Sequence, residues 1–225
     1  MAGSAQFNTC RSSLNALAAG VCVVVLMILS LGGCAMFGWA ADVVAGSSSG
    51  VEVEGEYLGL ADTTVAIVVA ADDRTLYRHP QVPQLLSRYV GGRISENMTS
   101  VTLIDPGQIA EFQQQNPHWS TLDYGELMNR LQVQRLVVID VFTYSLHDPA
   151  NKHVWRGVVA ANVNVVESDA ANPNTFAYMN TIRAQYPASP VPFLDSDERT
   201  IQHGLLQLFS RRTAGLFYRH KEPRH

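Results

Sequence analysis

Asp140 is the residue whose surroundings in the sequence most suggest chemistry. It interrupts an apolar run, VVIDVF at 137–142. A carboxylate that faces the protein interior is costly unless it is paired or hydrogen-bonded, and burial moves its pKa toward the range that acid–base catalysis uses. Asp140 is therefore either a site acid or a structural carboxylate, which faces the solvated side of a sheet or pairs with a cation such as Arg156. We favour the structural interpretation.

His147, Asp148 and His153 are the second candidate group, because they flank a predicted turn, DPAN at 148–151. Imidazole and carboxylate groups are zinc ligands, and three of them on one loop can hold that metal. No fourth ligand stands near them in the sequence. A solvated turn is the simpler interpretation, and we expect neither a metal nor another cofactor.

The known catalytic motifs give little support to an enzyme. Residues 46–50, GSSSG, formally match the G-x-S-x-G turn of serine hydrolases, but that turn needs a buried strand before it and a helix after it. The sequence contains no phosphate-binding loop, no H-E-x-x-H and no C-x-x-C. We expect a protein without catalytic activity; the alternative is an enzyme that uses Asp140 with nearby His or Arg residues.

The composition is that of one folded domain with a targeting segment. The chain has 225 residues, of which 47% are hydrophobic and 16% charged, and this is enough apolar material for a core. The formal net charge is −4, and no basic run stands outside the last residues. Nucleic acid is not expected as a partner, because binding its phosphates needs a concentrated basic face.

The hydrophobic pattern predicts the elements that would position these side chains. Residues 63–72 and 135–147 are apolar runs typical of buried strands, and 99–106 is a shorter one. Residues 152–168 end with period-two alternation, which predicts an antiparallel hairpin with the strand before them. Apolar residues at helical spacing predict four helices, which begin near Val82, Asp105, Asp123 and Asp195.

The order of these elements predicts an α+β fold, an α/β sandwich. We expect a mixed sheet of about five strands with an antiparallel meander, packed by about four helices including a C-terminal one. One right-handed β-α-β crossover followed by the meander is the simplest wiring. Residues 176–187 predict a further strand and 188–195 a proline-rich loop, and the polar end at 218–225 is expected to fray.

The start of the chain has the pattern of a secretory signal. Arg11 is the single charge in the first 33 residues, and an apolar run over 14–33 ends in small residues. A run of about 20 apolar residues can also span a bilayer, so an uncleaved transmembrane signal-anchor is the alternative. Cleavage before Cys34 would leave one cysteine, so no internal disulfide is predicted.

The stretch Leu31-Gly32-Gly33-Cys34 resembles the lipobox of bacterial lipoproteins, an apolar residue and two small ones before a cysteine. The resemblance implies that residues 1–33 are a signal peptide and that Cys34 carries acyl chains such as palmitate, which anchor the protein in a membrane. Residues 34–56 would then be a flexible tether and 57–225 a single domain of the cell envelope, facing the periplasm.

The residue after the cysteine bears on which membrane receives the protein. In some lipoproteins an Asp at this position causes retention in the inner membrane, and here Ala35 stands there. The resemblance therefore implies the outer membrane.

Residues 124–144 resemble the step from helix to central strand in a group of bacterial envelope domains. The group includes the curli-secretion lipoprotein, the lipoprotein activators of penicillin-binding proteins and the TolB N-terminal domain. Leu131 and Val133 match its Leu-Gly-Val/Ala-Asp pattern, whereas Gln132 and Gln134 replace the usual Gly and Asp. The resemblance implies a domain that binds envelope proteins or assembles into larger structures.

Two further features of the sequence bear on the predicted function. The turn at 147–153 is far too short for the membrane-inserting hairpins of a curli-type pore, so pore formation is not expected. Basic residues near the end of the last helix could meet lipid headgroups or an acidic partner, although cations are also favoured at a helix C-terminus. These residues are Arg211, Arg212, Arg219 and Lys221.

The sequence thus predicts a lipid-anchored, non-catalytic interaction or assembly module with an unidentified protein partner, and self-association is left open. A module that binds a small molecule or peptidoglycan is a third interpretation, and it should show an aromatic-lined groove. A deep pocket around Asp140 would favour the enzyme. An exposed apolar patch around the meander would favour protein binding.

Overall fold

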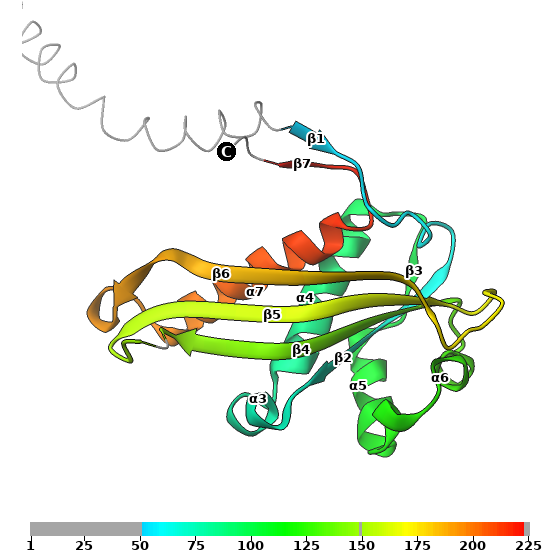
Figure 1. Cartoon of the computed structure of the whole chain (residues 1–225), viewed down its shortest axis with the longest axis horizontal. Helices are drawn as coiled ribbons and strands as arrows, with labels where there is room; N and C mark the ends of the chain where they lie inside the picture. Colours follow the sequence, from blue (N-terminus) through cyan, green and yellow to red (C-terminus); the bar gives the residue numbers. More distant parts are fainter. Residues whose placement is uncertain (1–50, 149, 223–225) are drawn as a thin grey trace, which may run out of the picture. The chain divides into compact units, whose positions relative to one another are not determined.

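A five-stranded mixed sheet is the centre of the structure, a computed structural model that describes residues 51–148 and 150–222 (Figure 1). Together with its helices this sheet confirms the predicted α+β class. The strands lie in the order β3-β2-β4-β5-β6. They are β2 (Thr64–Ala71), β3 (Thr102–Leu103), β4 (Arg135–His147), β5 (Val154–Glu167) and β6 (Phe176–Pro192).

The wiring combines a parallel half and an antiparallel half. β2 pairs in parallel with both β3 and β4, because the chain crosses from β2 to β3 through helices and then returns to the other side of β2. β4, β5 and β6 form the predicted antiparallel meander. In this register Asp140 of β4 lies opposite Asn162 of β5, and Asn162 lies opposite Thr181 of β6.

Five α-helices lie in the part of the chain that the structure describes, one more than the sequence predicts. They are α3 (Asp73–Arg78), α4 (Val82–Asn97), α5 (Pro106–Gln115), α6 (Tyr124–Leu131) and α7 (Glu198–Gly215), with short 3₁₀ turns η1 (Trp119–Thr121) and η2 (Phe193–Asp195). As predicted, the Asp105 carboxylate caps α5 and accepts hydrogen bonds from the backbone N–H groups of Gly107 and Gln108. α7 is capped by Asp197, not by the predicted Asp195.

The helices divide between the two faces of the sheet. α4 and α7 pack on the face that carries Val65, Ile67 and Val69 of β2, and this forms the larger core. α5 and α6 pack on the opposite face, over Ala66 and Val68, and form a smaller core. Period-two alternation along β2 therefore sends successive side chains into different cores.

The meander has one covered face and one open face. In Figure 1 α4 and α7 lie behind β4, β5 and β6. On the opposite side the described helices α5 and α6 pack over one end, where Leu136, Val138 and Val166 belong to the smaller core. The covered face is apolar and buried: Ile139, Val141, Val159, Ala161, Val163, Val165 and Ala184. The residues between them point to the other side, which we call the open face: Asp140, Phe142, Asn162, Asn164, Met179, Thr181 and Arg183.

The proline-rich segment at 188–195 was predicted as a loop, and this is wrong for its first half. β6 continues through it to Pro192 and pairs with β5 as far as the Val154–Pro192 position. Proline lacks a backbone N–H, but β6 is an edge strand, where that donor is not needed for the sheet.

The two ends of the described chain also differ from the prediction. Val51–Val53 forms strand β1 and His220–Glu222 forms β7, and together they make a separate two-stranded sheet. A tether up to residue 56 and a frayed end from 218 were expected there. Glu56 is also held, because its carboxylate accepts hydrogen bonds from the Tyr178 hydroxyl (2.6 Å) and the Asn180 amide (2.9 Å).

Gln132, which replaces the Gly of the envelope-domain pattern, occupies a position where glycine is favoured. It follows α6 with φ 54° and ψ 46°, the left-handed conformation that ends many helices. Its N–H bonds back to the carbonyl groups of Met128 and Asn129. A left-handed residue therefore ends α6 without the glycine that adopts this conformation most easily.

Candidate functional site

Asp140 lies half-buried on the open face, near the middle of β4. Its Oδ2 accepts a hydrogen bond from the Asn164 amide at 3.4 Å. Burial raises the pKa of the Asp140 carboxyl, and its charge adds to the burial that raises the pKa of the Tyr124 hydroxyl. Arg156, the cation suggested from the sequence, does not pair with Asp140; its guanidinium binds Asp148 at 3.1 Å.

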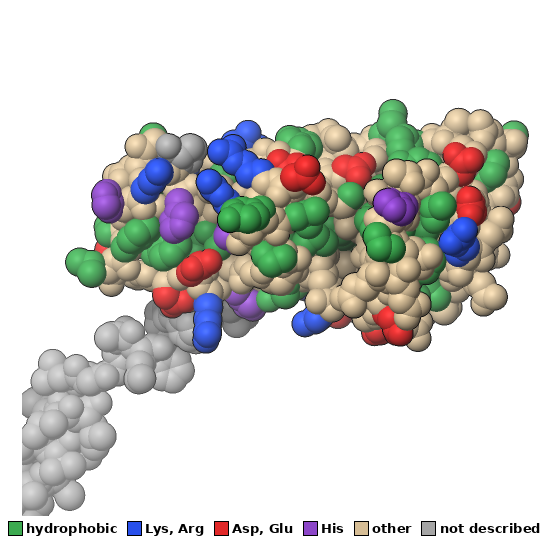
Figure 2. Space-filling view, turned by 90° about the horizontal axis from the view of Figure 1, so that it is seen from below, with side chains coloured by type: hydrophobic (Ala, Val, Ile, Leu, Met, Phe, Trp, Pro, Cys, Tyr) green, Lys and Arg blue, Asp and Glu red, His purple; other side chains and the backbone are tan. Residues whose placement is uncertain are grey.

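His147 and His153 lie in an aromatic cluster around the end of the β4–β5 hairpin. The His147 ring stacks on Trp155, with centroids 4.7 Å apart and an interplanar angle of 22°. Both histidines contact the Phe193 ring, at 5.5 and 6.4 Å between centroids. Figure 2 shows histidine side chains among hydrophobic ones at this end of the molecule. These imidazoles pack against rings and are not directed at a common centre.

Asp148, the predicted metal ligand, stabilises the turn through its carboxylate. Its carboxylate accepts hydrogen bonds from the N–H groups of Ala150 (2.7 Å) and Asn151 (3.2 Å), besides the bond from Arg156. In the part of the chain that the structure describes, no group of three or more His, Cys, Asp or Glu residues could hold a metal ion. Within residues 51–148 and 150–222, no hydrogen bond or ion pair joins Asp140 to either histidine.

The open face brings together residues that the sequence does not single out. The Thr181 hydroxyl donates to the Asn162 amide oxygen at 2.9 Å, and Asn164 donates to Asp140, so a ladder of polar side chains crosses the three strands. Two apolar side chains flank the ladder: Phe142 is 49% exposed and Met179 is 66% exposed. This combination can recognise a ligand through hydrogen bonds and apolar contacts.

The signal for this face in the sequence is weak. Phe142 stands at a β-bulge, because β4 slips in register between Val141 and Thr143. Simple alternation places Phe142 on the solvated side, but it does not show whether the side chain stays exposed in the fold. Met179 requires the strand assignment of β6 before its direction can be read.

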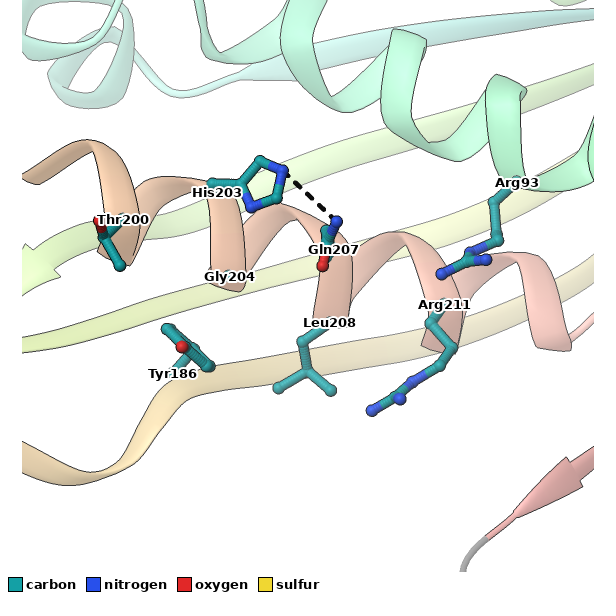
Figure 3. A pocket seen from close by; sticks show the side chains of 8 residues that line it. All are labelled: Arg93, Tyr186, Thr200, His203, Gly204, Gln207, Leu208 and Arg211. Carbon is teal, nitrogen blue, oxygen red and sulfur yellow. Dashed lines mark hydrogen bonds between the residues drawn. The ribbon is translucent and has the colours of Figure 1, made fainter. Parts of the chain in front are cut away.

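A second surface feature is a cavity of about 310 Å³ between α4, α7 and β6. Figure 3 shows Arg93 extending from α4, Tyr186 from β6, and the other lining residues along α7. Those residues are Thr200, His203, Gly204, Gln207, Leu208 and Arg211. In the sequence, only the basic character of α7 indicates this cavity. Nothing in the sequence indicates that Arg93 lines it too.

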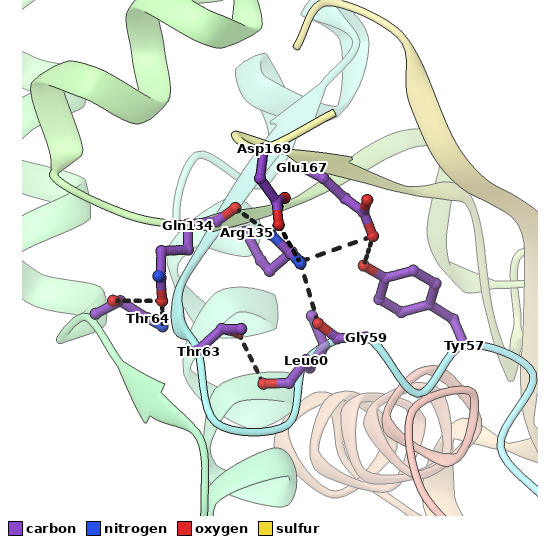
Figure 4. Close-up of polar contacts among 9 residues, drawn as sticks. All are labelled: Tyr57, Gly59, Leu60, Thr63, Thr64, Gln134, Arg135, Glu167 and Asp169. Atoms are coloured by element: carbon purple, nitrogen blue, oxygen red, sulfur yellow. Dashed lines mark hydrogen bonds and ion pairs between the residues drawn. The ribbon is translucent and has the colours of Figure 1, made fainter. Parts of the chain in front are cut away.

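A third polar cluster is structural (Figure 4). Arg135, at the start of β4, donates to the Gly59 carbonyl (3.1 Å) and to the Asp169 carboxylate (2.7 Å), and pairs with Glu167 at 3.7 Å. The Tyr57 hydroxyl donates to Glu167 at 2.6 Å. Burial, and then this hydrogen bond to a carboxylate, raise the pKa of Tyr57. The cluster ties the segment before β2 to β4 and to the end of β5.

Comparison with known proteins gives only loose similarities. No protein-family model and no curated protein matches the chain. The PelC dodecamer from Paraburkholderia phytofirmans is similar with a TM-score of 0.44 and 9% identity, over 75% of this chain and 96% of that one. Lipoprotein GNA1162 from Neisseria meningitidis gives 0.42 and 11%, over 62% and 90% of the two chains.

Protein XCC0632 from Xanthomonas campestris, of family DUF330, is similar at a TM-score of 0.43 and 10% identity, over 71% of this chain and 83% of that one. At scores this low the likeness carries no argument about function. Among the helices that the structure describes, none has both the length and the hydropathy that a membrane span requires.

Proposed function

We propose that this chain is a lipid-anchored protein of the cell envelope and binds a protein partner through the open face of its meander, without catalysis. The observation that carries the proposal is the pair of exposed apolar side chains, Phe142 and Met179, beside a ladder of polar side chains on the sheet face opposite α4 and α7. Protein interfaces combine apolar anchors with hydrogen-bonding groups in this way.

The surroundings of Asp140 support a binding role over an enzymatic one. Its hydrogen bond comes from an amide, and its electrostatic influence reaches a tyrosine hydroxyl. A general acid or base exchanges its proton with the substrate, often with a neighbouring ionisable group to restore it. Asn164 can orient the Asp140 carboxyl but cannot relay its proton, because an amide side chain has no ionisable proton at ordinary pH.

The edge of β6 is less suited to binding than the face beside it. An unpaired strand edge can add a strand from another chain, and natural proteins block such edges. Here the Arg212 guanidinium donates to the Arg183 carbonyl, and the Asn180 side chain accepts from the Thr181 N–H at 2.7 Å. Prolines at 187, 190 and 192 occupy the rest of the edge.

The anchor is a proposal from the sequence, because Leu31, Gly32, Gly33 and Cys34 lie outside the described residues. Mass spectrometry of the mature protein should find an acylated Cys34 at its N-terminus. Cys34→Ala should leave the precursor uncleaved, and the wild-type protein should fractionate with the outer membrane and face the periplasm. An intact Met1 on the wild-type protein would contradict the lipobox interpretation and favour the transmembrane signal-anchor.

The binding proposal is tested by crosslinked pull-down from membranes. The double variant Phe142→Asp, Met179→Asp should recover at least about tenfold less partner than the wild type, because charge replaces both apolar anchors. Tyr77→Asp is the matched control, since Tyr77 is 90% exposed on α3. Equal recovery by all three proteins, with unchanged unfolding midpoints, would place the partner elsewhere.

A further inference from the structure

The cavity between α4, α7 and β6 presents positive charge from two helices. Arg93 of α4 and Arg211 of α7 both line it, together with Gln207, whose amide nitrogen lies 3.4 Å from the Nε2 atom of His203 (Figure 3). No carboxylate is among its lining residues. The chain as a whole has a formal net charge of −4, so this concentration of guanidinium groups runs against its average charge.

The two guanidinium groups differ in what already binds them. Arg93 pairs with Glu96 at 3.2 Å, one turn further along the exposed side of α4. Arg211 forms no hydrogen bond or ion pair with any residue in the described ranges 51–148 and 150–222. The donors of Arg211 are therefore available to a ligand, and an exposed pair such as Arg93–Glu96 can be exchanged at little cost.

An aromatic ring forms the apolar wall of the same cavity. The Tyr186 ring lies directly against Gly204 of α7, where a Cβ atom would stand 2.2 Å from its Cε1. Any other residue at position 204 would push the ring away, so this glycine is needed for the close approach. Leu208, about one helical turn further along α7, continues the wall. One side of the cavity is thus cationic and the other apolar.

From this arrangement we propose that the cavity binds a phosphate group carried by an amphipathic ligand. A phosphate has several acceptor oxygens and matches the forked donors of arginine, so Arg93 and Arg211 are the groups that would bind it. A volume of about 310 Å³ exceeds the needs of the anion alone. The rest of the ligand, the glycerol and acyl part of a lipid or the sugar of a soluble ester, would lie on Tyr186 and Leu208.

Isothermal titration calorimetry of the full-length protein, in phosphate-free buffer with a non-ionic detergent, tests this site. The titrants are inorganic phosphate, glycerol 1-phosphate and a short-chain phosphatidylglycerol. Arg211→Gln should weaken binding of all three by at least about tenfold, and Arg93→Gln with Arg211→Gln should abolish it. Arg130→Gln is the matched control, because Arg130 is an exposed arginine of α6 paired with Glu126.

The titrants distinguish the two sources of the phosphate. Tighter binding of phosphatidylglycerol than of glycerol 1-phosphate would assign the site to a lipid headgroup, and Gly204→Ala should then reduce that preference by displacing Tyr186. Equal affinities would assign it to a soluble ester. No heat from any titrant would overturn the proposal. Equal binding by the wild type and the double arginine variant, with unchanged unfolding midpoints, would overturn it as well.

Discussion

The covered and open faces of the β4–β5–β6 meander are built from alternate residues of the same strands, yet their side chains differ in kind. On β4, Ile139 is fully buried under the α4–α7 layer, while its neighbour Asp140 points to the open side. On β5, Val163 is buried between Asn162 and Asn164, which both belong to the open face. Alternate positions of the same strand thus supply the core and the open face.

This division explains why the open face can carry exposed apolar groups. The covered face continues into a large core that includes Phe209 and Phe217, both fully buried. Because burial of that apolar area supplies most of the stabilisation, the open face is free to vary in chemistry. Substitutions on the covered face should therefore lower the free energy of unfolding more than substitutions on the open face.

The largest expected effect comes from truncating the covered face. Ile139→Ala should lower the free energy of unfolding by about 2–5 kcal/mol, because it leaves a cavity in the core. Phe142→Ala, three residues along the same strand, should change it by about 0.5 kcal/mol or less, since the side chain is 49% exposed. Urea denaturation measures both; similar losses would mean that the open face is also a packed core.

Asn164 should give an intermediate effect, because it is the most buried polar side chain of the open face. It is 6% exposed and donates to Asp140. Asn164→Ala should cost about 1 kcal/mol in the free energy of unfolding, through the lost hydrogen bond and the carboxylate left without it. Asn162→Ala is the matched control at an exposed position of the same strand. An equally large loss of stability there would show that burial of Asn164 does not cause the effect.

The smallest effect is the pH dependence contributed by Asp140. Burial raises the pKa of its carboxyl in the folded state. Between the unfolded value, about 3.9, and the raised folded value, the folded protein holds a proton that the unfolded chain has lost, so stability falls as the pH rises.

Asp140→Asn should remove this fall, so that the variant is at least as stable as the wild type at pH 7 and loses that advantage near pH 4. Unfolding midpoints at both pH values measure it. A variant that is less stable than the wild type at pH 7 alone would show that the ionised carboxylate is stabilising.

The sequence predicts the elements where one pattern dominates. The apolar run of β4 is predicted at its full length, Arg135–His147, and Asp105 with Pro106 predicts the start of α5. The prediction fails where local chemistry misleads. β6 contains prolines tolerated only at a sheet edge, and α3 has six residues, too few to show helical periodicity.

The candidate sites are less predictable, because they depend on tertiary placement. Alternation shows that Asp140 and Ile139 point in opposite directions, but it does not show which side the helices cover. His147 and His153 flank a turn as expected, but the His147 ring stacks on Trp155 and the His153 ring packs against Phe193. Arg93 and Arg211 line one cavity only because α4 packs beside α7.

Site-specific photocrosslinking in cells is the most direct test of whether the open face binds a protein. A photoreactive phenylalanine analogue would replace Phe142 or Met179 on the open face, and Tyr77 or Leu194 as controls elsewhere that are more exposed than either. If the open face binds a protein, only its two positions should give a discrete crosslinked species, with another envelope protein or a second copy of this chain. Crosslinks from the controls alone, or from none of the four positions in a correctly folded protein, would contradict it.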